Sequence, residues 1–141
     1  MLDMSMFREK SEILRKDHDK RKIPHDNIDE VIRLDNEWKQ ARYEVDQLRK
    51  TRNESARGIA AAKKSGDSEA VDKIMNEVSS IGKNIEELSK KVEKLWEMRD
   101  SIRMSIPNIL HESVPVGEDD QKNTLHSLHG EKIDLSFKAM N

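Results

Sequence analysis

The chain has 141 residues, of which 34% are hydrophobic, 4% aromatic and 38% charged, and its formal net charge is −2. These values exclude an ordinary compact globule, which needs more apolar material to fill its core. With five glycines and three prolines, they fit either long helices that share a narrow apolar seam or a disordered chain. Because the apolar residues recur with a helical period, we predict helices.

Cysteine is absent from the sequence. Its absence excludes disulfides, thiolate metal sites and cysteine nucleophiles, and it is typical of a protein from a reducing cytoplasm. No apolar run approaches the length that spans a membrane, and the N-terminal stretch MLDMSMFREKSEILRKD becomes charged too early for a signal peptide. We therefore predict a soluble cytoplasmic protein with no membrane partner.

Residues 1–26 are expected to form short helices with a modest apolar face made of Met4, Phe7, Ile13 and Leu14. Pro24 disfavours helix before it, and Asp26 or Asn27 is expected to cap the long helix that follows.

Residues 27–104 carry a heptad pattern of apolar or small residues. Its first half, which Arg52 and Ser55 interrupt, consists of Val31, Leu34, Trp38, Ala41, Val45, Leu48, Ile59 and Ala62. Its second half consists of Val71, Ile74, Val78, Ile81, Ile85, Leu88, Val92, Leu95 and Ile102, and the charged Arg99 occupies one further seam position. Between the halves, Gly66 suits a helix C-cap, and Asp67 or Ser68 suits the next N-cap.

A single turn at residues 65–67 places every seam residue of one half opposite a seam residue of the other, for example Ala41 opposite Val92. We therefore predict an all-α fold in which residues 27–104 form a long antiparallel two-helix coiled-coil hairpin within an arm domain of residues 1–104. Each arm of about 38 residues is expected to be about 57 Å long. Pairing between two chains, as a swapped dimer, is the alternative, and the tight turn favours a monomeric hairpin.

Positive charge gathers on the distal half of the first arm. The stretch RKTRNESARGIAAAKKSG, residues 49–66, holds six cations and one acid, Glu54. Heptad positions e and f predict one stripe, about 33 Å long, whose members are Arg42, Arg49, Lys50, Arg57, Lys63 and Lys64. Lys83 and Lys90, at position f of the second arm, are weaker candidates. The residues expected opposite the e positions are Ser89, Gly82 and Met75, whereas on the other edge Glu44 faces Lys91.

Two interpretations of this stripe stay open. A run of charge is most often a solvated face, but a coiled coil that used these cations to recognise itself would place carboxylates opposite them. Their absence favours a partner outside the chain, either a phosphate backbone or an acidic protein. Only Tyr43 lies near the stripe, so a surface for stacking single-stranded bases is not expected.

The polar seam residues Arg52 and Ser55 either set the register of the hairpin or lie where solvent reaches it, and we expect a structural role for Arg52. His126 and His129 are spaced like neighbours on a helix, but no third metal ligand accompanies them. The sequence shows no glycine-rich phosphate loop, no nucleophile with a base and no carboxylate pair. We therefore predict no catalytic, cofactor or metal site in this chain.

Residues 105–141 are expected to be an extended linker. Their first part, IPNILHESVPVGEDDQKN, contains two prolines and a glycine, and the stretch KIDLSF at residues 132–137 is a candidate short strand.

Three stretches of this chain resemble the N-terminal region of seryl-tRNA synthetases. They are the start MLDMSMFRE, a first-arm set made of Leu48, Arg52, Asn53, Ser55, Arg57 and Ile59, and a linker of the form I-P-N-x-x-H-x-x-V-P-x-G from Ile106 to Gly117. The linker is the most specific of the three, and the resemblance covers residues 1–123. In the tail, Asn123 and Gly130 keep the family's spacing, but SLHGE replaces its Arg-Trp element.

The resemblance implies a coiled-coil arm that binds the long variable arm and elbow of serine tRNA, mainly through backbone shape. It also implies a catalytic domain after this segment, which uses ATP and Mg²⁺ to attach serine to tRNA in a homodimeric parent enzyme. This chain alone is expected to be a monomer that binds tRNA without aminoacylating it. Of the predicted stripe, the resemblance supports a basic residue at Arg57, and the other members rest on heptad geometry. The alternative is a stand-alone interaction or chaperone-like coiled coil that binds an acidic protein.

Overall fold

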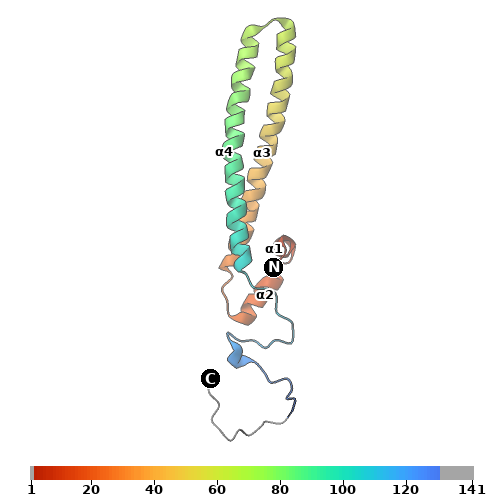
Figure 1. Ribbon diagram of the computed structural model, residues 1–141, viewed down its shortest axis with the longest axis vertical. Helices are drawn as coiled ribbons and strands as arrows, with labels where there is room; N and C mark the ends of the chain where they lie inside the picture. Colours follow the sequence, from red (N-terminus) through yellow and green to blue (C-terminus); the bar gives the residue numbers. More distant parts are fainter. Residues whose placement is uncertain (1, 131–141) are drawn as a thin grey trace.

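The computed structural model describes residues 2–130, which form four α-helices and one short 3₁₀ helix. Helices α3 (Asp26–Ser65) and α4 (Ser68–Ser105) run side by side as the two arms of a hairpin (Figure 1). Helices α1 (Met4–Glu9) and α2 (Ser11–Arg21) lie at its open end, and the 3₁₀ helix η1 (Asp120–Lys122) lies beyond them. The predicted all-α hairpin is confirmed, and the strand predicted at residues 132–137 lies outside the described residues.

The hairpin turn has the predicted caps. Gly66 has left-handed backbone angles (φ 73°, ψ 14°), and the N–H groups of Gly66 and Asp67 donate to carbonyls of the last turn of α3. The Asp67 carboxylate accepts a hydrogen bond of 3.0 Å from the Ala70 N–H and thereby caps α4. At the other end of α3, the prediction of a cap by Asp26 or Asn27 is wrong, because the helix already includes Asp26 and its N-cap is His25.

Replacing Gly66 with alanine is expected to destabilise the chain by about 1 kcal/mol, because a side chain at positive φ is strained even in open space. The matched control is Gly82→Ala in the interior of α4, where the added Cβ also meets no atom within 4 Å. That substitution is expected to stabilise the chain by about 0.5–1 kcal/mol. Urea unfolding followed by circular dichroism measures both changes. A Gly66→Ala variant as stable as the unchanged chain, or more stable, would show that the turn does not depend on a left-handed Gly66.

Buried apolar side chains form three clusters from the base of the hairpin to its middle. The first consists of Leu2, Phe7, Leu14, Ile28, Val31 and Ile106, and Ile102 of α4 packs against it, so that it joins α1, α2 and both arms. The other two lie between the arms and contain the predicted facing pairs Ala41–Val92 and Val45–Leu88, as the predicted register requires. Burial of one aliphatic side chain contributes about 1.5–3 kcal/mol, so the base and middle hold the fold together.

Packing becomes thinner toward the turn. Between residues 52 and 78, no described seam side chain is fully buried, and Ile59 and Val71 are half-buried. Arg52 is exposed, and its side chain makes no hydrogen bond or ion pair within residues 2–130. The structural role predicted for Arg52 is therefore wrong, because solvent reaches the seam at this height and the guanidinium needs no partner inside the hairpin.

The N-terminal helices use only part of the predicted apolar face. Phe7 and Leu14 are buried in the first cluster and Met4 packs against it, whereas Ile13 is 44% exposed. Helix α1 begins with a side-chain cap, in which Asp3 accepts a hydrogen bond of 2.8 Å from the Ser5 N–H.

The linker that follows α4 packs against α2 instead of leaving the base freely. Its first residue, Ile106, belongs to the first apolar cluster. Three hydrogen bonds then join it to α2: Leu110 N–H to Asp17 Oδ1 (2.7 Å), Arg21 Nη2 to the Asn108 carbonyl (2.7 Å), and Gly117 N–H to the Lys20 carbonyl (3.1 Å). The direction in which the chain leaves the arm is therefore fixed by α2.

Candidate nucleic-acid interface

The distal half of α3 presents a group of unpaired cations, which we call the distal basic face: Lys50, Arg52, Arg57, Lys63 and Lys64. All five side chains are exposed, and none forms an ion pair within residues 2–130. Lys50, Arg57 and Lys64 follow one another at intervals of seven residues, which places them on one side of the helix at steps of about 10 Å. Because Glu54 is the one acid in residues 49–66, this surface favours a negatively charged partner.

Two of the other predicted cations are partly neutralised within their own helices. The Arg49 Nη1 atom lies 3.6 Å from Asp46 Oδ1, and the Lys90 Nζ atom lies 2.8 Å from Glu86 Oε1. The hydrogen bond between Lys90 and Glu86 raises the pKa of the lysine and lowers the pKa of the carboxyl. Lys83 is exposed and has no ion pair in the described part of the chain.

Arg42 forms no ion pair in the described part of the chain but lies against an aromatic ring. Its Cζ atom is 5.2 Å from the centroid of the Trp38 ring, within the range of a cation–π interaction. On the other edge of the hairpin, the expected partnership of Glu44 with Lys91 is wrong. Glu44 instead accepts a hydrogen bond of 2.8 Å from Gln40, one turn earlier in α3.

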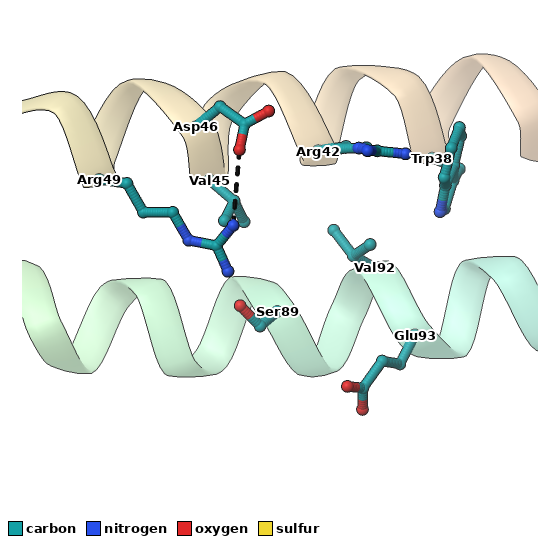
Figure 2. Close-up of a pocket in the computed structure, with 8 residues that line it drawn as sticks. All are labelled: Trp38, Arg42, Val45, Asp46, Arg49, Ser89, Val92 and Glu93. Atoms are coloured by element: carbon teal, nitrogen blue, oxygen red, sulfur yellow. Dashed lines mark ion pairs between the residues drawn. The ribbon is translucent and has the colours of Figure 1, made fainter.

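A groove of about 250 Å³ lies beside the seam, below the distal basic face, and is lined by Trp38, Arg42, Val45, Asp46, Arg49, Ser89, Val92 and Glu93. Figure 2 shows Arg49 reaching from α3 toward Ser89 on α4, while Arg42 extends along α3 toward Trp38. On the α4 side of the groove, the small side chain of Ser89 lies at the position predicted opposite Arg42. We call this groove the arginine groove.

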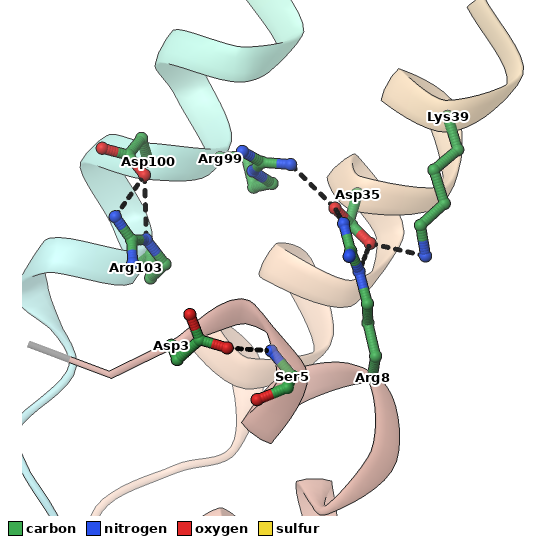
Figure 3. Close-up of polar contacts among 8 residues, drawn as sticks. All are labelled: Asp3, Ser5, Arg8, Asp35, Lys39, Arg99, Asp100 and Arg103. Carbon is green, nitrogen blue, oxygen red and sulfur yellow. Dashed lines mark hydrogen bonds and ion pairs between the residues drawn. The ribbon is translucent and has the colours of Figure 1, made fainter. Parts of the chain in front are cut away.

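At the base of the arm, one buried carboxylate joins three elements (Figure 3). Asp35 on α3 accepts hydrogen bonds from Arg8 of α1 at 2.7 and 2.8 Å and from Arg99 of α4 at 2.7 Å. The Lys39 Nζ atom lies 2.8 Å from the same carboxylate. The side chains of Asp35 and Arg99 are 2% and 6% exposed, whereas those of Arg8 and Lys39 are 39% and 44% exposed. Asp35 and Arg99 therefore form the buried part of the cluster.

The cationic neighbours of Asp35 lower its pKa. Burial alone would raise it, but the hydrogen bonds from Arg8 and Lys39, the Arg8 charge and the hydrogen bond from Arg99 hold it well below the ordinary range. We did not predict this cluster from the sequence. The available signal was Arg99, a charged residue at a seam position in an otherwise apolar second arm.

Two negative findings apply to residues 2–130. No three His, Asp or Glu side chains there are arranged to hold a metal ion, and His126 and His129 are both exposed. The helices of the described part are too short or too polar to pass through a bilayer.

The chain matches the family model of the seryl-tRNA synthetase N-terminal domain over residues 1–110. It is 40% identical over 127 residues to serine–tRNA ligase from Thermococcus onnurineus, which covers 87% of this chain and 27% of the relative. It is 33% identical over 141 residues to the ligase from Fervidobacterium nodosum, which covers 99% of this chain and 33% of the relative. The chain thus spans about a third or less of the length of these curated relatives.

Solved structures agree with the sequence matches. The crystal structure of seryl-tRNA synthetase from Pyrococcus horikoshii complexed with ATP superposes with a TM-score of 0.79 at 37% identity, over 87% of this chain and 28% of that one. The cytoplasmic serine–tRNA ligase from Naegleria fowleri in complex with AMP gives a TM-score of 0.80 at 20% identity, over 93% and 35%. The second likeness concerns the fold alone. With the family model matching most of its length, the chain belongs to the seryl-tRNA synthetase N-terminal domain family.

Proposed function

We propose that this chain is the tRNA-binding arm of a serine–tRNA ligase. In this proposal the arm binds the long variable arm and elbow of serine tRNA, mainly through contacts with phosphates. The observation that carries it is the distal basic face, whose five exposed cations have no ion-pair partner within residues 2–130. Such a surface fits a polyanion, because each phosphate it neutralises releases condensed counterions. Family membership supports serine tRNA as that polyanion.

The proposal assigns phosphate contacts by position. Lys50, Arg57 and Lys64 lie on one side of α3 at regular steps and are the main contacts. Lys63 and Arg52 lie nearer the seam on the same stretch, and Lys83 extends the surface onto α4. The hairpin holds these charges far from the base, which suits recognition of an RNA helix by shape. Lys90 is the weakest of the predicted contacts, because Glu86 already holds its charge.

The proposal extends to the longer protein to which such an arm belongs. That protein would activate serine with ATP and Mg²⁺ and attach it to tRNA as a homodimer, while the arm itself carries out no chemistry. The similarity to the Pyrococcus horikoshii seryl-tRNA synthetase complexed with ATP supports this extension.

A competition experiment tests whether the long variable arm is the target. The chain is bound to labelled serine tRNA and challenged with unlabelled serine tRNA or with the same tRNA whose variable arm is shortened. Because the shortened tRNA loses several phosphate contacts, its affinity as a competitor is expected to be lower by about tenfold or more. Equal competition by both tRNAs would contradict recognition of the variable arm. Stronger competition by an acidic polypeptide such as polyglutamate would favour a protein partner.

A further inference from the structure

Two seam residues near the base of the hairpin break its aliphatic pattern and lie against each other. Trp38 of α3 is the one aromatic residue in the predicted seam, and Arg99 of α4 is buried there. The Arg99 Cζ atom is 4.9 Å from the centroid of the Trp38 ring, and the Arg99 Nη1 atom donates to Asp35 at 2.7 Å. The ring therefore rests against a guanidinium that a buried carboxylate holds in place.

The same ring also contacts Arg42, which lines the arginine groove. The Arg42 Cζ atom is 5.2 Å from the ring centroid, and within the described residues Arg42 has no carboxylate partner that could otherwise orient it. A long, exposed arginine without such support samples many rotamers, and ordering it on binding costs free energy. Contact with a fixed ring reduces the number of rotamers before any ligand arrives.

We propose that Trp38 is a positioning residue that holds the Arg42 guanidinium in the arginine groove, where Arg42 and Arg49 together bind one phosphate of an RNA backbone. This inference rests on the proposed function and adds to it a defined phosphate subsite below the distal basic face. Planar guanidinium groups suit the site because each can donate two hydrogen bonds to one phosphate. The Ser89 hydroxyl, toward which Arg49 points (Figure 2), adds a further donor.

The charges in the groove are compatible with this assignment. Asp46 binds Arg49 only loosely, at 3.6 Å and with both side chains more than half exposed, so a phosphate can replace it as the partner of Arg49. Glu93 also lines the groove, but its carboxylate points away from α3 (Figure 2). Two guanidinium groups, those of Arg42 and Arg49, thus line the groove from α3. Glu93 still repels a phosphate in the groove. Removal of its charge is therefore expected to strengthen phosphate binding.

A double-mutant cycle on the affinity for serine tRNA tests the role of Trp38. Arg42→Ala is expected to weaken binding by about tenfold. It is also expected to lower by about one the salt slope, which is the steepness with which the logarithm of the association constant falls with the logarithm of the salt concentration. Trp38→Leu is expected to weaken binding by about two- to fivefold, and to have no further effect in the Arg42→Ala background. Trp38→Phe keeps an aromatic face and is expected to restore most of the affinity. Circular dichroism and thermal unfolding confirm that each variant is folded at the temperature used.

Two further measurements separate positioning from a purely structural role. In a Trp96→Phe chain, Trp38 is the sole tryptophan, and its emission is expected to change on tRNA binding only while Arg42 is present. Glu93→Gln is expected to raise the affinity, whereas Glu87→Gln, a matched change outside the groove, is expected to raise it less.

The outcomes distinguish this inference from the proposed function. If the wild-type chain binds no serine tRNA, the proposed function and the role of Trp38 are both overturned. If the wild type binds but Trp38→Leu and Arg42→Ala weaken binding additively, only the role of Trp38 is overturned. If Glu93→Gln weakens binding, the groove does not hold a phosphate.

Discussion

Replacing Lys50, Arg57 and Lys64 together with glutamate is expected to lower the affinity for serine tRNA on the order of a thousandfold at low salt. These exposed cations have no ion-pair partner within residues 2–130, so their reversal removes three attractive charges and adds three repulsive ones. The salt slope of binding is expected to fall by about three, one unit for each lost phosphate contact. Fluorescence anisotropy with labelled serine tRNA over a salt series measures both quantities.

The matched control reverses three exposed lysines outside the distal half of the arm: Lys10, Lys16 and Lys94. They also lack ion-pair partners within the described residues, and the triple change alters the net charge by the same amount. At the 0.1 M point of the salt series we expect this control to weaken binding far less, because repulsion between charges is screened there beyond about 10 Å. Equal losses in the two triple variants would show that RNA responds to net charge alone, and the distal basic face would lose its assigned role.

Asp35→Ala is expected to destabilise the chain by about 3–5 kcal/mol. The cost arises because Arg99, with a side chain that is 6% exposed, loses its partner and becomes an uncompensated buried charge. Arg8 and Lys39 contribute little to this cost, because their side chains are already 39% and 44% exposed. Urea unfolding followed by circular dichroism measures the change in the free energy of unfolding.

Two comparisons test this explanation of the loss. Asp29→Ala removes the exposed ion pair with Arg15 and is expected to cost less than about 1 kcal/mol. Asp35→Leu combined with Arg99→Met replaces the buried pair by apolar side chains and is expected to recover most of the stability. A double variant as unstable as Asp35→Ala would mean that the cluster does not act through the unpaired charge of Arg99.

The same cluster predicts how stability depends on pH. Because the pKa of folded Asp35 lies well below its ordinary value, the folded state binds fewer protons at this site than the unfolded state in mildly acidic solution. Its contribution is therefore fully present above about pH 5, and falls as the pH drops through the unfolded pKa of about 3.9 and toward the folded one. The difference in unfolding free energy between the wild type and Asp35→Asn is expected to shrink between pH 5 and pH 3. A difference that stays constant in this range would show that the cluster does not depend on an ionised Asp35.

The sequence predicted the hairpin well, because heptad spacing and caps are local signals. The alternation of apolar residues determined which side chains of α3 and α4 face one another, and Gly66 and Asp67 marked the turn. Seam periodicity failed at Arg52. A heptad position predicts which side of the helix a residue occupies. Whether its side chain is buried depends on how tightly α3 and α4 pack at that point along the hairpin.

Features that depend on residues far apart in sequence escaped prediction. The Asp35 cluster needs α1 to return to the base of the hairpin, and it joins residues 27 and 64 positions apart. The contact between Asp17 and Leu110 spans 93 positions, and no local sequence pattern predicts it. Heptad position predicted which cations lie on the arm's surface. The ion pairs of Arg49 with Asp46 and of Lys90 with Glu86, which form within single helices, could be identified only from side-chain positions.

The most direct test of the central claim is the equilibrium affinity of the wild-type chain for serine tRNA, measured by titration from about 50 to 200 mM salt. We predict saturable binding in which the logarithm of the association constant falls linearly with the logarithm of the salt concentration, with a slope that reports several phosphate contacts. No detectable binding at the lowest salt, or an affinity that does not respond to salt, would contradict a tRNA-binding arm that acts through the distal basic face.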